Sequence, residues 1–173
     1  MRFFTQSECI AWCTKLLLPL NESGVPIGTA DRSFRLRCVV PEPPGRVLWL
    51  ARYLEDILQP RGDCLVWITG FGIFPSSENN HLYYRLRQSY FDHRLLSEAP
   101  GHLCLDYQRA EVVTLLYLGM LYSWDMHIIP CAGFGHAFLS HDSGLHIALG
   151  SPAQIENAAR ALTDAEIVFE RKS

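Results

Sequence analysis

The chain has 173 residues, a formal net charge of −3 and an isoelectric point near 6.1. Hydrophobic residues make up 49% and charged residues 19%, which excludes the polar, highly charged compositions of disordered proteins. The slightly acidic balance argues against nucleic-acid binding, which usually needs a basic surface. A chain of this length can bury enough surface to fold without staples, so one domain over residues 1–173 is expected.

Three features predict a protein of the cytoplasm with no membrane contact. The N-terminal stretch MRFFTQSECIAW is interrupted by Gln6, Ser7 and Glu8, unlike the apolar core of a signal peptide. The longest apolar segment, VVTLLYLGMLYSW, has 13 residues, too few to span a bilayer. The six cysteines form no Cys-x-x-Cys pair, so we expect buried reduced thiols and no bound cofactor or metal.

In chain order, the first elements are a helix and a strand. Thr5 and Glu8 stand at capping-box spacing and predict a helix over about residues 6–17. A polar loop follows, and FRLRCVV then alternates apolar and basic residues from position 34 to position 40. Such alternation is typical of a half-buried strand.

A helix, a buried strand and a second helix are expected next. RVLWLARYLEDIL carries its apolar residues on one helical stripe and is ended by Pro60 and Gly62. CLVWIT predicts a buried strand from residue 64 to about 69. Ser76 or Ser77 is a suitable cap for the helix that follows.

The second half of the chain is richer in strands. A short strand, LCL, leads to Asp106, the expected cap of a core helix over residues 107–122 that is apolar nearly all round. DMHII, HAFLS and LHIAL are strand-like, and the last two are expected to form a hairpin around HDSG, where Gly144 can adopt a positive φ. Ser151 and Pro152 begin a final helix, and AEIVFERK is left open between a strand and a tail.

Short links between the later strands favour antiparallel pairing. The sequence therefore predicts a single α+β domain, with helices packed on a mostly antiparallel sheet of about five strands. A doubly wound parallel sheet stays as the alternative, because helices and strands alternate in the first half of the chain.

One candidate polar site lies in residues 125–146, a segment rich in imidazoles and carboxylates. The candidate residues are Asp125, His127, His136, His141 and Asp142. Alternation along a strand places Asp125 and His127 on one face, and a hairpin centred near residue 141 would place His136 opposite His146. A zinc site needs three or four converging ligands, and no metal-binding spacing is present, so hydrogen-bonded histidines on a sheet surface are the simpler interpretation.

Other catalytic or phosphate-binding motifs are incomplete. WITGFGIFPSSEN has Gly-x-Gly after a strand, but it lacks the third glycine of a dinucleotide loop and the lysine of a Walker loop. Ser140, His141 and Asp142 are the residue types of a catalytic triad, but neighbours on a strand point to opposite faces.

Aromatic residues and arginines are interleaved between residues 67 and 94. Tyr, Trp and Arg are enriched among the residues that dominate protein interfaces. If Tyr83 turns inward, its neighbours lie nearer the surface, and the expected partner-binding residues are Phe71, Phe74, Tyr84, Arg87 and Arg94.

Together these patterns predict a small soluble accessory protein that acts by binding another protein, for example by neutralising or chaperoning it. The alternative is a hydrolase or metal-dependent enzyme that uses the histidines of residues 125–146.

Overall fold

A computed structural model describes residues 1–27, 35–58, 62–71, 79–131 and 135–172. Its strands are β1 (Arg2–Phe4), β2 (Arg35–Val39), β3 (Cys64–Gly70), β4 (Gly101–Cys104), β5 (Asp125–Pro130), β6 (Gly135–Leu139), β7 (Gly144–Leu149) and β8 (Phe169–Lys172). Its helices are α1 (Gln6–Lys15), α2 (Pro44–Leu58), α3 (Asn79–Ser89), α4 (Arg109–Leu121) and α5 (Pro152–Asp164). The expected serine caps of α3 and Phe34 of the second strand lie outside the described residues.

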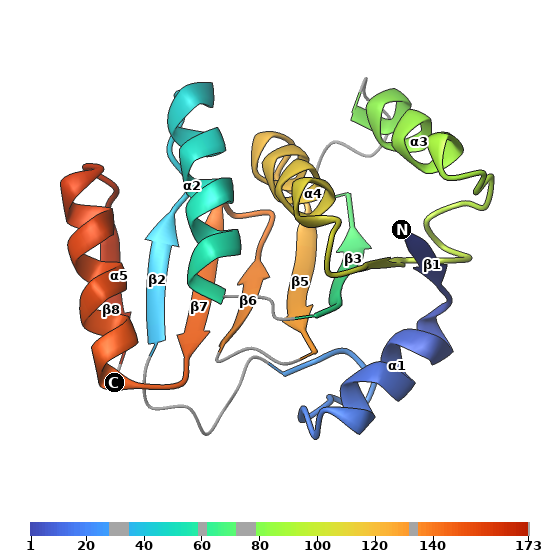
Figure 1. Ribbon diagram of the computed structural model, residues 1–173, viewed down its shortest axis with the longest axis horizontal. Helices are drawn as coiled ribbons and strands as arrows, with labels where there is room; N and C mark the ends of the chain where they lie inside the picture. Colours follow the sequence, from blue (N-terminus) through green and yellow to red (C-terminus); the bar gives the residue numbers. More distant parts are fainter. Residues whose placement is uncertain (28–34, 59–61, 72–78, 132–134, 173) are drawn as a thin grey trace.

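The strands form one sheet in the order β1-β4-β3-β5-β6-β7-β2-β8, with every neighbouring pair antiparallel (Figure 1). The predicted single α+β domain is confirmed, and the parallel alternative is wrong. The expected count of about five strands was too low, because the described residues contain eight. β1 was not predicted, since three residues show no periodicity and the strand exists only through pairing with β4.

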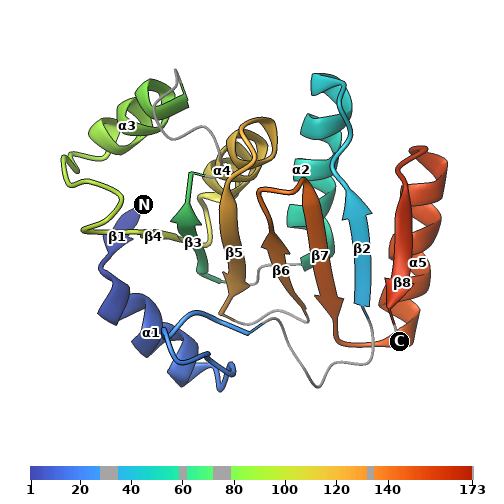
Figure 2. The same ribbon diagram turned by 180° about the vertical axis from the view of Figure 1, so that it is seen from behind.

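The helices divide unequally between the two faces of the sheet. α2, α4 and α5 lie on the face seen in Figure 1, and they bury the inward-facing residues of β2, β3, β5, β6 and β7. Figure 2 shows the opposite face, where α1 lies near the β3–β4 side of the sheet. There Cys9 and Cys13 of α1 pack against Leu65, Trp67 and Ile129. None of the described helices has the length and hydropathy of a membrane-spanning segment.

Local signals predicted the first residues of two helices correctly. The capping box of Thr5 and Glu8 starts α1, and Ser151 caps α5 with Pro152 in its first turn. The expected cap of α4 was wrong. Its first turn follows Gln108, and the Asp106 carboxylate instead accepts a hydrogen bond from the Gly62 N–H at 2.9 Å.

The hairpin of β6 and β7 is present as predicted, with Leu139 opposite Leu145. Its turn differs in detail. Ser143 has the positive φ of 58°, whereas Gly144 pairs with Val39 as the first residue of β7. The left-handed residue is therefore a serine rather than the glycine that follows it.

Leu116 lies at the centre of α4 and is fully buried. We predict that Leu116→Ala lowers the free energy of unfolding by about 2–5 kcal/mol, the range for a truncated core leucine. Urea unfolding measures this loss. The exposed Thr114→Ala on the same helix is the control and should change stability by less than about 0.5 kcal/mol. Equal effects of the two substitutions would place the core elsewhere.

Candidate functional site

Arg87 was expected near the surface, but its side chain is completely buried. Its Nη1 donates to the Tyr83 hydroxyl at 2.7 Å and to the Ala99 carbonyl at 2.9 Å. Its Nε and Nη2 both donate to one carboxylate oxygen of Asp92, at 3.1 and 2.5 Å. The guanidinium also lies 4.4 Å from the centre of the Phe3 ring. All three guanidinium nitrogens of Arg87 therefore have hydrogen-bond partners inside the protein.

The hydrogen bonds of Arg87 continue through Tyr83 to His102. The His102 Nδ1 lies 3.2 Å from the Val66 carbonyl, which can only accept, so Nδ1 carries the proton. The Nε2 of His102 then accepts from the Tyr83 hydroxyl at 2.9 Å. Burial, followed by the charge of Arg87, lowers the pKa of His102 to about 3, so this imidazole stays neutral. The network joins α3 to strands β4 and β3.

Two other residues of the expected partner-binding set also pack inward. Phe71 lies edge-on to Tyr83 and Trp124, each at 5.1 Å between ring centres. The Tyr84 ring packs edge-on against Tyr83, and its hydroxyl accepts from the Leu96 N–H at 3.3 Å. Phe74 lies outside the described residues.

Arg94 is the member of that set with a well-exposed side chain, at 44%. It binds Asp92 and donates to the Phe3 carbonyl at 3.2 Å. Arg94 therefore belongs both to the predicted partner-binding set and to the exposed residues of this segment.

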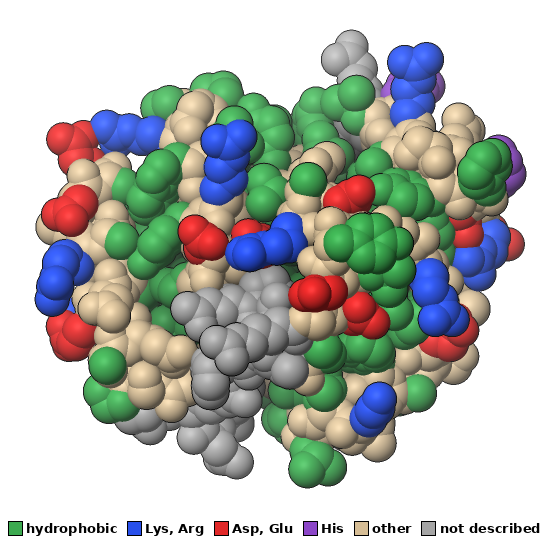
Figure 3. Space-filling model, viewed as in Figure 1, with side chains coloured by type: hydrophobic (Ala, Val, Ile, Leu, Met, Phe, Trp, Pro, Cys, Tyr) green, Lys and Arg blue, Asp and Glu red, His purple; other side chains and the backbone are tan. Residues whose placement is uncertain are grey.

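Exposed side chains of the segment from α3 to residue 95 form a mixed basic and apolar surface. We call it the α3 surface, and it consists of Leu82, Arg85, Phe91, His93, Arg94 and Leu95. Figure 3 shows basic, histidine and hydrophobic side chains together over α3. From residue 79 to residue 97 the chain has three arginines and one aspartate, a formal charge of +2 in a protein of net charge −3.

Phe91 is the most exposed large hydrophobic residue of this surface, at 91%. Its N–H donates to the Gln88 carbonyl and the next N–H, of Asp92, donates to the Arg87 carbonyl. This pair of bonds ends a helix with a left-handed residue, usually glycine, and Phe91 has a φ of 59°. The position after the helix was visible in the sequence, but its φ and exposure were not.

The residues of the candidate polar site form two separate groups, one of three residues and one of two. His141 Nδ1 and its backbone N–H both bond one oxygen of Asp125, at 3.0 and 2.9 Å, and His141 Nε2 lies 3.4 Å from Asp142. The hydrogen bond and charge of Asp125 raise the pKa of the exposed His141. His127 and His136 are instead buried in the sheet, with His127 Nδ1 3.4 Å from His136 Nε2.

The expected pairing of His136 with His146 was wrong by two positions. His136 lies opposite Ala148, and His146 lies opposite Phe138, because the β6–β7 turn is centred nearer residue 142 than residue 141. His127 pairs with Phe138 across β5 and β6. In the described part of the chain, no three His, Cys, Asp or Glu side chains gather in a geometry suited to a metal ion.

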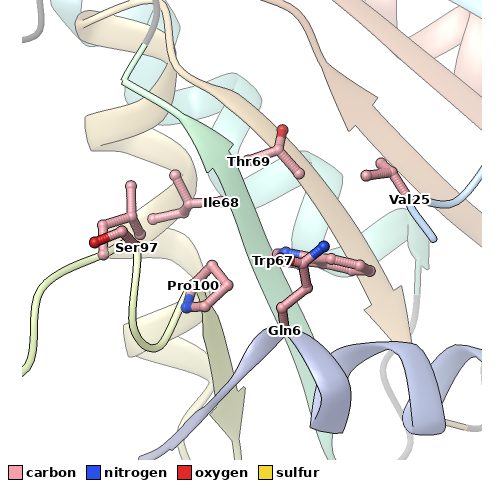
Figure 4. Close-up of a pocket in the computed structure, with 8 residues that line it drawn as sticks. Gln6, Val25, Trp67, Ile68, Thr69, Ser97 and Pro100 are labelled. Carbon is pink, nitrogen blue, oxygen red and sulfur yellow. The ribbon is translucent and has the colours of Figure 1, made fainter. Parts of the chain in front are cut away.

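A cavity of about 390 Å³ opens beside β3 (Figure 4). Trp67, Ile68 and Thr69 of β3 line it, together with Gln6 of α1, Val25, and the segment Leu96, Ser97 and Pro100. None of these eight residues is charged, which suits an uncharged group. The cavity contains none of the histidines, so the polar groups and the cavity are separate features.

Acid should unfold this protein through its buried histidines. Burial lowers the pKa of His127 to about 3, as it does for His102, with a smaller contribution from His136. The unfolded chain binds these protons near pH 6.5, so their contribution to stability is complete above that pH and is lost as the pH falls toward 3. Each histidine should contribute a slope of about 1.4 kcal/mol per pH unit.

Urea unfolding at several pH values between 7 and 4 measures this dependence. His127→Phe removes one of the two groups and should reduce the slope. A stability that stays level between pH 7 and 4.5 would contradict the assignment of neutral buried imidazoles.

Comparisons with other proteins give no relative of this chain. It matches no protein-family model, no curated protein sequence and no solved structure.

Proposed function

We propose that this chain is a small soluble accessory protein that binds another protein through the α3 surface, for example to neutralise or chaperone it. The exposed aromatic ring of Phe91, in a segment with the exposed Arg85 and Arg94, carries the proposal. A left-handed backbone costs an ordinary residue about 1–2 kcal/mol, and an exposed phenyl ring recovers nothing by burial within this chain. A partner that covers the Phe91 ring would supply the burial that the ring lacks in the free protein.

The surroundings of Phe91 support a protein partner with acidic groups. Arg85, His93 and Arg94 lie in the same segment, and aromatic and arginine side chains are the usual anchors of interfaces. Asp92 is already paired with Arg87 and Arg94, and the Glu98 carboxylate turns back to the Leu95 N–H at 2.7 Å. The acidic residues of the segment are therefore engaged within the chain.

The α3 surface is also held rigidly from below. The Arg87 network fixes both the helix and the segment that follows it, so few side chains have to become ordered when a partner binds. Leu96 and Ser97, which line the cavity beside β3, follow Leu95 of the α3 surface directly in the chain.

The remaining parts of the proposal concern location and partner class. We place the protein in the cytoplasm, which is supported by six cysteines without a disulfide, five of them buried. We assign a protein rather than a nucleic acid as the partner, because the chain as a whole is acidic.

We predict that Phe91→Gly raises stability and abolishes partner binding. Relief of the left-handed backbone outweighs the extra flexibility of glycine, so unfolding should become harder by about 0.5–1 kcal/mol. Tagged protein in lysate of the native cell should capture an acidic protein that the variant does not capture. Thermal unfolding and quantitative capture measure the two effects.

Leu17→Gly is the matched control for this substitution. Leu17 also follows a helix, has a φ of 56° and is 90% exposed, but the helix it follows is α1. It should gain similar stability and keep the partner. Capture that survives Phe91→Gly, or that both variants lose alike, would refute binding through the α3 surface.

A hydrolase or metal-dependent enzyme that uses the histidines is the second candidate, and the Asp125–His141 pair favours it. Asp125 holds Nδ1 of an exposed imidazole, as a general base requires. We predict for this candidate that hydrolysis of p-nitrophenyl acetate rises as the pH passes the raised pKa of His141, and that His141→Gln removes this rise. The same rate in His141→Gln and wild type would eliminate the candidate.

A further inference from the structure

The buried pair of His127 and His136 has a geometry that the proposed function does not use. Both residues lie in the central strands of the sheet and are only 3% and 4% exposed. Their rings are parallel, with an interplanar angle of 0°, and the ring centres are 5.5 Å apart. His127 Nδ1 and His136 Nε2 are separated by 3.4 Å.

These distances show that the two rings meet edge to edge. The nitrogens are 2.1 Å closer together than the ring centres (5.5 against 3.4 Å), which is close to the sum of the two centre-to-nitrogen distances. The two nitrogens therefore lie between the rings, near the line that joins their centres. Face-to-face stacking would not place them there. One imidazole donates its N–H to the lone pair of the other.

Two opposed imidazole nitrogens are the donor set of a linear, two-coordinate metal ion. We propose that His127 Nδ1 and His136 Nε2 bind one Cu(I) ion between them. Imidazole is a suitable ligand for copper, and a monovalent d¹⁰ ion accepts two ligands in a line. With metal–nitrogen bonds of about 2 Å, the nitrogens have to separate by roughly half an ångström.

Zn²⁺ needs three or four protein ligands, and no third His, Cys, Asp or Glu of the described residues joins the pair in a metal-binding geometry. The described rings around His127 are Trp67 at 6.4 Å and Phe138 at 4.6 Å between ring centres. Aromatic rings offer no such ligand, but they favour a nearby positive charge. A monovalent ion also loses less hydration energy on burial than a divalent one.

Binding needs no net loss of a proton. The imidazole that donates the N–H between the rings moves that proton to its outer nitrogen. Both inner nitrogens then present lone pairs to the ion. The complex gains one positive charge, and copper keeps its oxidation state, so no oxidant or reductant is involved. The inference goes beyond the proposed function, and its test uses no protein partner.

The test is anaerobic titration with Cu(I) supplied as its acetonitrile complex, in competition with bathocuproine disulfonate. Cysteine is a strong ligand for Cu(I), so the titration uses Cys131→Ser, which removes the cysteine that is not buried. We expect roughly one equivalent of competitor-resistant copper, with two nitrogen neighbours and no sulfur in its X-ray absorption spectrum. Adding His127→Phe should remove that equivalent, and adding His81→Phe should retain it.

Two results would overturn the site: sulfur ligation of the copper, or an unchanged copper content in His127→Phe. Nitrogen NMR of the wild-type histidines gives a readout that does not depend on the folding of a variant. Cu(I) should shift His127 Nδ1 and His136 Nε2 together and leave His102 unchanged. Shifts at neither nitrogen of the pair would equally refute the proposal.

Discussion

The ion pair of Arg87 with Asp92 is the interaction on which the β1 side of the molecule depends. A buried guanidinium needs a charge partner and acceptors for its remaining N–H groups, and Asp92, Tyr83 and Ala99 supply them. Through these contacts α3, the segment after it and β4 form one unit, with Phe3 of β1 over the guanidinium. Loss of either charge would leave the other buried alone, which typically costs about 3–5 kcal/mol.

The same ion pair connects stability to binding. Arg87 and Asp92 enclose the turn at Phe91, so the strained residue is held by neighbours that are bonded to each other. Natural proteins retain such local strain where the surrounding structure overdetermines it, and often at sites of function. A surface that is rigid before contact loses little entropy when it binds. The buried network is thus the support for the proposed interface rather than part of it.

Local chemistry in the sequence was enough for most elements and insufficient for the site. Thr5, Glu8 and Ser151 cap helices through contacts within four residues, so these helix starts were predictable. The alternation in FRLRCVV reflects the buried and exposed faces of one strand, so this strand was predictable as well. The burial of Arg87 depends on Ala99 and Phe3, which are distant in sequence. The partners of His136 depend on the centre of the β6–β7 turn, which lies nearer residue 142 than the expected residue 141. Even a small shift in register changes every cross-strand neighbour. Helical spacing predicted that Tyr83 faces inward. Arg87 lies one turn later on the same face of α3 and is buried as well, although an arginine is usually exposed.

The position of β2 in the sheet has a consequence for how the chain is made. β2 pairs with β7 and β8, so residues 35–39 find their neighbours only among residues 144–172. Pairings between such distant segments form slowly, and a nascent chain presents its N-terminal part first. During synthesis, the segment that contains Leu36 and Cys38 therefore stays unpaired until almost the whole chain has left the ribosome. Truncation near residue 140 would leave that strand without a partner and prone to association with other chains.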